Sequence, residues 1–280
     1  MTGIVDIARN REDIISLWHE CFGDERDYIE FFLDRCPNKI CLGSFDGNRL
    51  VSMLFLLNGN VLDLTCKYIY AACTAEEYRC RGIMGELIER AKKLCSDGGT
   101  DCIFLVPAEE TLYKYYEKFG FIPKMQRAEL TFVGKRSVCS LHETDDIKRV
   151  AELRYELLSS VKCFRFDFET TEYTVAEFLK TGGKIYAEYG KNKFLAFAEA
   201  NGKNVVIKEF LTDFDGIFTK YSNLIENLGA ENVYIHAPLV YNSSDNGCKG
   251  TKCGMLFPVT KKAKDCINED DIFYSGMYLD

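Results

Sequence analysis

The spacing of apolar residues changes repeatedly along the first half of the chain, and each change predicts a new element. Residues 3–8 predict a short strand, and apolar side chains at helical spacing predict helices over 9–22 and 27–36. Two strand-like runs then flank residues 46–48, Asp-Gly-Asn, which is a strong hairpin signal. The chain is therefore expected to begin with a strand, two helices and a hairpin.

The next stretch predicts a strand that leads through a glycine-bearing turn into an amphipathic helix. The strand covers residues 67–74, and the helix covers 82–95 and is closed by a glycine pair. Residues 101–107, DCIFLVP, lack polar alternation and predict a central strand buried on both faces. Two further elements are expected, a helix at 109–119 and a strand at 121–133. This order indicates an α/β protein with a mixed sheet.

A second series of elements in the same order begins after residue 136. The expected strand, two helices, three strands, helix and strand lie at 138–141, 145–160, 173–180, 184–190, 193–201, 204–213, 215–228 and 232–239. Two apolar runs close the chain, at 253–259 and 273–280. The repeated order predicts two domains, residues 1–135 and residues 136–280, although the residues themselves differ.

Composition limits the classes of partner and location. A length of 280 residues suits two domains, and an apolar content of 47% supplies material for two cores. The net charge of -8 argues against a nucleic-acid partner held by phosphate contacts and suits an amine. The sequence contains neither a signal-peptide core nor an apolar run of the ~18 residues that a membrane helix needs. We expect a globular cytoplasmic protein without a membrane partner, of open oligomeric state.

The thirteen cysteines predict buried, reduced thiols. Their number is odd, no C-x-x-C pair occurs, and several lie in apolar strand-like runs, which argues against a disulfide framework. Cys248 and Cys253 are the only close pair in a loop-like stretch, and the three histidines give no zinc spacing. We therefore expect no metal site.

Residues 78–88, YRCRGIMGELI, combine a turn, two arginines and a helix start. Gly82 and Gly85 can adopt unusual dihedral angles and allow the backbone to approach a ligand. The exposed N–H groups of a helix start favour an anion, and Arg79 and Arg81 add fixed positive charge. We interpret the stretch as a pyrophosphate cradle. The alternative is an ordinary strand-to-helix connection with a glycine in its turn.

Two motifs in this half resemble signatures of the GCN5-related N-acetyltransferase (GNAT) superfamily. Arg79, Gly82, Ile83 and Met84 resemble its R-x-x-G-x-G/A acyl-CoA-binding motif, although Met84 stands where the family usually has Gly or Ala. Residues 112–123, LYKYYEKFGFIP, resemble the second signature, Y-x-x-x-G-F. The resemblance covers most of residues 1–135 and implies a GNAT fold that binds acetyl-CoA.

The second half resembles a degenerate GNAT-like domain. Where a cradle is expected the chain reads LTDFDGIFTKY, which has acidic side chains and no arginine. The arrangement is similar to tandem acetyltransferases of the enhanced-intracellular-survival type without their third domain. By this resemblance, residues 1–135 bind the cofactor, and residues 136–280 complete the acceptor pocket without binding CoA.

The resemblance also implies which residues hold acetyl-CoA. In the family, the pantetheine arm lies in a splay between the fourth and fifth strands, which corresponds here to residues 72–74 opposite Leu105 and Val106. The thioester carbonyl would accept a hydrogen bond from a backbone N–H near Cys73, whose thiol we interpret as a packing group rather than a nucleophile. The expected cofactor-binding residues are Ala72, Cys73, Thr74, Arg79, Cys80, Arg81, Gly82, Ile83, Met84 and Gly85.

Tyr116 is the expected general acid. It lies four residues before Gly120, at the family position from which a tyrosine reaches the cofactor sulfur, and a phenol can return a proton to a thiolate. Tyr113, one turn earlier on nearly the same face, is the second choice. The alternative is that these tyrosines only pack against a core.

The sequence does not identify a general base. The three histidines, His19, His142 and His236, fall outside the cofactor motifs, so proton removal is expected through water to a glutamate or to a chain terminus. Tandem acetyltransferases of the enhanced-intracellular-survival type end in a carboxylate that enters the catalytic pocket. Asp280, which ends this chain after an apolar run, is therefore a second candidate catalytic residue.

We expect an acetyl-CoA-dependent N-acetyltransferase that acts by direct attack of an amine in a ternary complex. The acceptor is a small molecule or peptide with a primary amine, which the sequence does not identify further. Two alternatives remain: an aminoacyltransferase of the Fem type, whose donor is a charged tRNA, and a non-catalytic acyl-CoA sensor. The cradle and the net acidity disfavour the first.

Overall fold

The computed structural model describes residues 2–133, 142–213, 230–239, 250–276 and 279. Its chain forms two compact units. The first unit consists of Met1–Lys124, Arg165–Thr170 and Gly254–Asp271, and the second of Met125–Phe164, Thr171–Cys253 and Ile272–Asp280. Within the described ranges, no helix is both long enough and apolar enough to cross a membrane.

A mixed sheet forms the centre of the first unit. Its strands, in spatial order, are β1 (Thr2–Ile4), β2 (Ile40–Asp46), β3 (Arg49–Val61), β4 (Leu64–Thr74), β5 (Cys102–Leu105) and β12 (Gly250–Pro258). Neighbouring strands are antiparallel except for β4 and β5, which are parallel. The short strand β7 (Phe164–Phe166) pairs with β3.

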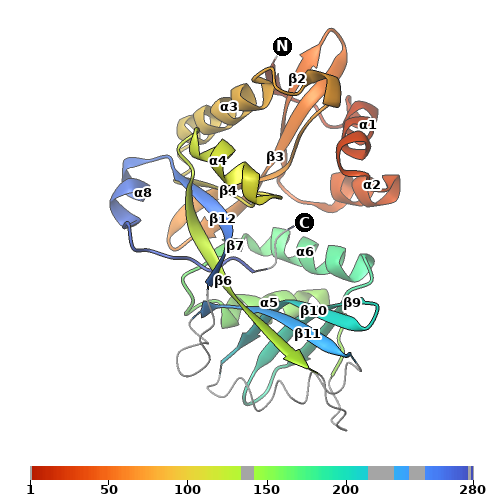
Figure 1. The fold of residues 1–280 in the computed structure, drawn as a ribbon, viewed down its shortest axis with the longest axis vertical. Coiled ribbons are helices and arrows are strands. Elements are labelled where there is room, and N and C mark those ends of the chain that lie inside the picture. The colour runs from red at the N-terminus through yellow and green to blue at the C-terminus, as the bar shows by residue number, and fades with distance from the viewer. Residues whose placement is uncertain (1, 134–141, 214–229, 240–249, 277–278, 280) are drawn as a thin grey trace. The chain divides into compact units, whose positions relative to one another are not determined.

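Two layers of helices cover the sheet of the first unit. They are α1 (Arg11–Phe22), α2 (Arg26–Arg35), α3 (Ile83–Asp97) and α4 (Glu110–Glu117). Figure 1 shows α1 and α2 on one face of this sheet and α3 and α4 on the other. Side chains alternate accordingly along β3: Leu54 and Leu56 join the core under α3 and α4, while the Phe55 ring centroid lies 5.6 Å from that of Trp18 and 4.9 Å from that of Phe32.

The sheet of the second unit repeats the strand pattern of the first. Its order is β6 (Ile122–Val133), β11 (Asn232–Ala237), β10 (Asn204–Thr212), β9 (Phe194–Asn201) and β8 (Lys184–Glu188). As in β2 to β5, two antiparallel pairs precede a parallel pair, here β10 with β11. Among the described residues of this unit, the helices are α5 (Ile147–Leu157) and α6 (Phe168–Lys180). This pattern confirms the predicted mixed α/β fold.

Each sheet is completed by a strand from the other half of the sequence. In the first unit, Met255–Pro258 of β12 pair antiparallel with β5. In the second, Ala128–Val133 of β6 pair antiparallel with β11. The predicted strand up to residue 133 is therefore present, but its second half belongs to the second sheet. The predicted boundary at residue 135 lies outside the described residues and stays a prediction.

Most expected elements are present with ends shifted by a few residues. The first strand ends at Ile4, and α6 begins five residues before the predicted 173, at Phe168. The described part of the run at 273–280 forms isolated bridges at Phe273 and Tyr274 rather than a strand. The expected strand at 138–141 and helix at 215–228 lie outside the described residues.

Three short elements were not predicted: β7, the 3₁₀ turn η1 (Glu76–Tyr78) and α8 (Lys261–Cys266). None is long enough to show an apolar period. The start of α8 is fixed by its cap, where the Thr260 hydroxyl accepts a hydrogen bond from the Ala263 backbone N–H at 3.2 Å. A cap of this kind is a single side-chain hydrogen bond, which the spacing of apolar residues does not reveal.

A buried ion pair joins α5 to β10 inside the second unit. The Arg154 guanidinium donates to both oxygens of the Glu209 carboxylate, at 2.5 and 3.1 Å, and their side chains are 2% and 0% exposed. The Tyr274 hydroxyl donates to the same carboxylate at 3.2 Å. A Cβ on Gly276 would overlap this carboxylate, so glycine is required where the C-terminal segment passes it. The pair thus ties α5, β10 and the segment after residue 272 together.

Replacing one partner of this pair is expected to destabilise the protein strongly. Glu209→Gln leaves the Arg154 charge buried without a counter-ion, so the free energy of unfolding should fall by about 3–5 kcal/mol. The matched control is Lys203→Met, which breaks an exposed pair with Glu231 and should cost less than about 1 kcal/mol. Urea unfolding measures both, and equal losses would contradict the assignment.

Candidate functional site

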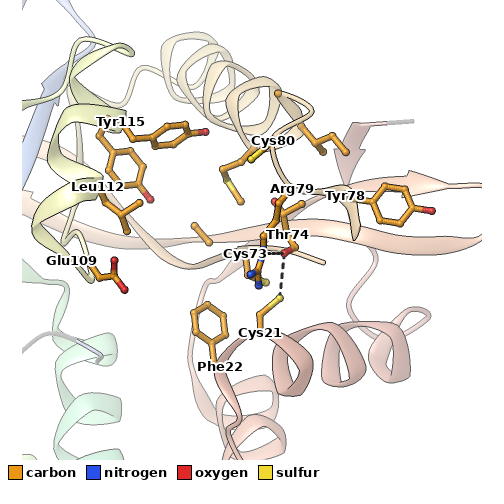
Figure 2. Close-up of a pocket in the computed structure, with 15 residues that line it drawn as sticks. Cys21, Phe22, Cys73, Thr74, Tyr78, Arg79, Cys80, Glu109, Leu112 and Tyr115 are labelled. Carbon is orange, nitrogen blue, oxygen red and sulfur yellow. Dashed lines mark hydrogen bonds between the residues drawn. The ribbon is translucent and has the colours of Figure 1, made fainter. Parts of the chain in front are cut away.

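A cavity of about 590 Å³ lies in the first unit (Figure 2). Its walls come from the end of α1, the end of β4, the turn into α3 with the first residues of that helix, and α4 from its N-cap to its last turn. All the residues expected to bind the cofactor or to act in catalysis line it, except Arg81, Gly85 and Asp280. Asp280 lies outside the described residues. One cavity therefore brings both sequence motifs together.

The cavity begins where two parallel strands stop pairing. β4 pairs with β5 from Cys66 to Ile69, and the last pair joins Ile69 to Leu105. β4 then continues to Thr74, with β3 still paired on its other side. The pairing therefore ends before residues 72–74, as the expected splay requires, but Leu105 lies opposite Ile69 and not opposite residues 72–74. Of the residues expected on its two sides, 72–74 line the cavity, whereas Leu105 is buried in the core.

A β-bulge in β4 lies at the same place. Met53 pairs with Cys73 and Phe55 with Tyr70, so two residues of β4 oppose the single residue between them on β3. Ala71, in this bulge, has a left-handed φ of 47°. Because an extra residue changes which side chains face each side of the sheet, the bulge determines which part of β4 reaches the cavity.

The turn between β4 and α3 suits an anion. Cys80 and Gly82 adopt left-handed conformations, with φ of 61° and 80°, on either side of Arg81. Gly82 is also the N-cap of α3 and provides no capping side chain. The first N–H groups of a helix lack intrahelical acceptors, and alternating left-handed residues form backbone nests that bind anions. This backbone can therefore receive a phosphate without a side-chain ligand.

The two arginines of the turn have different surroundings. Arg79 lines the cavity, and its Nε donates to the Thr74 carbonyl oxygen at 3.1 Å. Arg81 donates to the Glu77 carbonyl oxygen at 2.6 Å, and its guanidinium carbon lies 5.0 Å from the Tyr78 ring centroid. Among the described lining residues, Arg79 is the only lysine or arginine. Arg79 thus provides the positive charge of the cavity, and Arg81 braces the turn.

Met84 and Gly85 also differ in position. Met84 lines the cavity and packs against the core under α3 and α4. A Cβ on Gly85 would lie 3.0 Å from Cζ of Phe119, so glycine here lets α3 approach the end of α4 closely. Gly85 was expected to let the backbone approach a ligand; in the structure its missing side chain makes room for Phe119.

Three tyrosines lie on α4, and two of them line the cavity. Tyr116 is buried, its ring centroid lies 5.3 Å from that of Tyr115, and both side chains reach the cavity. Tyr113, the second choice for a general acid, is buried in the core and does not line it. Burial, with a smaller effect of Tyr115, raises the pKa of Tyr116 to about 12. The Tyr116 phenol therefore keeps its proton at neutral pH.

Six lining residues were not among the predicted site residues: Cys21, Phe22, Tyr78, Glu109, Leu112 and Tyr115. Cys21 and Phe22 end α1, far from both motifs in the sequence, and no local pattern marks them. Glu109 is the N-cap of α4 and the only carboxylate among the described lining residues. Figure 2 shows it across the cavity from Arg79. The cavity therefore carries opposite charges on opposite sides.

The remaining candidate chemistry lies elsewhere. The three histidines do not line the cavity; His19, for example, is exposed and its Nδ1 contacts the Asp24 carbonyl oxygen at 2.8 Å. The described cysteines are all free and most are buried, as predicted. Cys253 lies in β12 rather than in the expected loop, and Cys248 is outside the described residues. Nowhere in the described part of the chain do three His, Cys, Asp or Glu residues gather as a possible metal site.

Comparison with known proteins relates the cavity to one enzyme superfamily. The family model of the acetyltransferase (GNAT) domain matches residues 8–123, which include both motifs and the whole cavity wall. No curated protein sequence is detectably similar to the chain.

Solved structures share the fold across nearly the whole chain. A probable N-acyltransferase from Enterococcus faecalis is 14% identical, with a TM-score of 0.72 over 92% of this chain and 72% of that one. Eis1 from Mycobacterium abscessus is 10% identical, with a TM-score of 0.68 over 92% and 74%. A tandem GNAT protein from the clavulanic acid biosynthesis pathway is 10% identical, with a TM-score of 0.55 over 93% and 98%. At these identities the likeness shows the fold alone.

Proposed function

Because the family model of the acetyltransferase (GNAT) domain matches residues 8–123, we propose that the protein transfers an acetyl group from acetyl-CoA to a primary amine. One observation carries the proposal. A single cavity joins the unpaired side of β4, the anion-suited turn at Gly82 and the protonated phenol of Tyr116. These are the parts that hold a phosphorylated thioester and protonate its leaving group.

In this proposal, the cofactor lies along the β4 side of the cavity. Its pyrophosphate binds the backbone N–H groups at the start of α3, beside Arg79. Its pantetheine arm follows residues 72–74, where β4 has no neighbour on the β5 side. This position points the thioester toward α4 and Tyr116.

The reaction needs no covalent enzyme intermediate. The lone pair of a neutral amine attacks the thioester carbon, the C–N bond forms, and the C–S bond breaks to release a thiolate. Tyr116 donates its proton to this thiolate, and a backbone N–H near Cys73 stabilises the carbonyl oxygen in the transition state. The amine loses its proton through water toward Glu109, across the cavity.

The second half of the chain and the acceptor also belong to the proposal. Residues 136–280 would complete the acceptor pocket without binding a second cofactor. Asp280 stays a candidate catalytic residue, and its position lies outside the described residues. The acceptor would be a small molecule or peptide in the cytoplasm. A non-catalytic acyl-CoA sensor is the main alternative, because the same cavity would serve binding alone.

Acetyl-CoA is expected to stabilise the wild-type protein against thermal unfolding. At a hundred times the dissociation constant, the gain should be about 2.7 kcal/mol. Gly82→Glu places a carboxylate at the phosphate position and should abolish the gain. Gly82→Asn is the matched control, because Asn tolerates the left-handed φ of 80° and no atom lies within 4 Å of its Cβ. A cooperatively folded wild-type protein that shows no gain would overturn the proposal.

Tyr116→Phe is expected to lower kcat by about a hundredfold or more, because it removes the proton donor. The dissociation constant of acetyl-CoA should hardly change. Tyr113→Phe, on the same helix but away from the cavity, should have little effect. Mass spectrometry of acetylated products, with a panel of small amines and peptides, measures turnover. A wild-type protein that binds acetyl-CoA but acetylates nothing would favour the sensor.

Glu109→Gln is expected to raise the KM of a cationic amine acceptor about tenfold, because the charge-assisted contact to its ammonium is lost, and to lower kcat, because the amide cannot take up the amine's proton. The KM of acetyl-CoA should stay unchanged. Glu110→Gln removes the neighbouring exposed carboxylate, which does not line the cavity, and serves as the control. Equal effects of the two substitutions would show that only general surface charge attracts the acceptor.

A further inference from the structure

We propose that Cys21 and Cys73 form a peroxide-sensitive thiol pair, which closes the cavity by joining into a disulfide. Cys21 lies near the end of α1 and Cys73 near the end of β4. Both line the cavity, and neither thiol has a role in the acetyl transfer described above. The site is therefore a modification site inside the candidate active site.

The two thiols meet beside one carbonyl group. The Cys21 thiol donates to the Thr74 carbonyl oxygen at 3.5 Å and also interacts with the thiol of Cys73, the preceding residue. Figure 2 shows Cys21 and Cys73 at this wall of the cavity, next to the Arg79 side chain. Arg79 donates to the same carbonyl oxygen at 3.1 Å. Two elements distant in sequence thus hold a thiol pair and a guanidinium in one place.

The surroundings give the two thiols different roles. The hydrogen bond with Cys73, followed by that with Arg79, lowers the pKa of Cys21 to about 7, although burial and the Glu20 carboxylate oppose this shift. The interaction with Cys21, followed by burial, raises the pKa of Cys73 well above 9. At neutral pH Cys21 is therefore partly a thiolate, while Cys73 stays protonated. A thiolate beside a thiol is the arrangement of an attacking and a resolving cysteine.

Other described cysteines lack one of these properties. In six of them, desolvation by burial raises the pKa of the thiol, and the protein shields it from oxidants. They are Cys36, Cys41, Cys66, Cys95, Cys102 and Cys253. Cys80 and Cys266 are exposed, and Cys266 interacts with Cys102, whose pKa burial raises to about 12. Cys21 alone, among the described cysteines, combines partial exposure with a lowered pKa. Selective oxidation should therefore begin there.

The chemistry needs a hydroperoxide as oxidant and proceeds in two balanced steps. The Cys21 thiolate attacks one peroxide oxygen, the O–O bond breaks, and Cys21 sulfenic acid and hydroxide form. The Cys73 sulfur then attacks the Cys21 sulfur, the S–O bond breaks, and water leaves with the Cys73 proton. Two thiols and one hydrogen peroxide thus give one disulfide and two waters. A thiol reductant reverses the change.

The consequence for the cofactor rests on the proposed function, whereas the disulfide itself does not. A bond from Cys21 to Cys73 would cross the wall along which the pantetheine arm is expected, at residues 72–74. Oxidised protein should therefore lose acetyl-CoA binding, and reduction should restore it. Bound acetyl-CoA should conversely protect the two thiols.

Hydrogen peroxide titration followed by mass spectrometry tests the disulfide. The expected result is loss of two hydrogen atoms per chain and a linked peptide that contains Cys21 and Cys73, at peroxide levels that leave Cys266 reduced. Cys21→Ser should abolish the link, and Cys73→Ser should leave Cys21 with one added oxygen. Cys266→Ser is the control and should behave as wild type. Oxidation of Cys80 or Cys266 first, or a stable oxygen adduct on wild-type Cys21, would overturn the proposal.

Two further measurements separate this proposal from the proposed function. Iodoacetamide labelling of Cys21 should rise with pH and be half-maximal near pH 7, whereas an ordinary thiol is half-ionised near pH 8.5. Acetyl-CoA binding should then be compared before oxidation, after it and after reduction. If the reduced protein fails to bind acetyl-CoA, the proposed function fails while the linked peptide still decides the thiol pair. If the linked protein binds acetyl-CoA as well as the reduced protein, closure of the cavity is refuted.

Discussion

The pairing between β4 and β5 stops at Ile69 and Leu105, and the location of the cavity depends on this break. Beyond it β4 is held only by β3, through a bulge at Ala71, so one side of its backbone is open. The chain can then turn through the left-handed Gly82 and start α3 at the mouth of this opening. If β4 and β5 paired over more residues, hydrogen bonds between the strands would fill this opening. The start of α3 and the Tyr116 phenol would then not line one cavity.

The parts of the cavity wall that could be predicted from the sequence are those whose residues lie close together in the chain. The turn at Gly82 and the tyrosine of α4 were predicted because each belongs to a short pattern with a local physical cause. The sequence alone could not separate Arg79 from Arg81, since their different roles depend on contacts with Thr74 and Glu77 that follow from the turn's shape. Cys21 was missed because it meets β4 only through tertiary packing.

The fold shows the same limit. Hydrophobic period predicted most strands and helices and their repeated order, because each buries one face against its own sheet. It could not show which sheet receives β6 and β12. A strand's own apolar pattern shows which of its faces is buried, but its partner strand is chosen by contacts between residues far apart in the sequence. The ion pair of Arg154 with Glu209 was equally invisible, since charged residues in an alternating pattern usually face solvent.

The exchange of closing strands has a consequence for biosynthesis. The strand that covers the outer edge of β5, Met255–Pro258, leaves the ribosome about 150 residues after Leu105, the last residue of β5. Until then the nascent first sheet presents an apolar edge that can recruit strands of other chains. The first sheet consequently lacks its closing strand until residues 255–258 have been made. Chaperone demand and sensitivity to premature termination should therefore be greater than for an acetyltransferase domain that supplies all of its own strands.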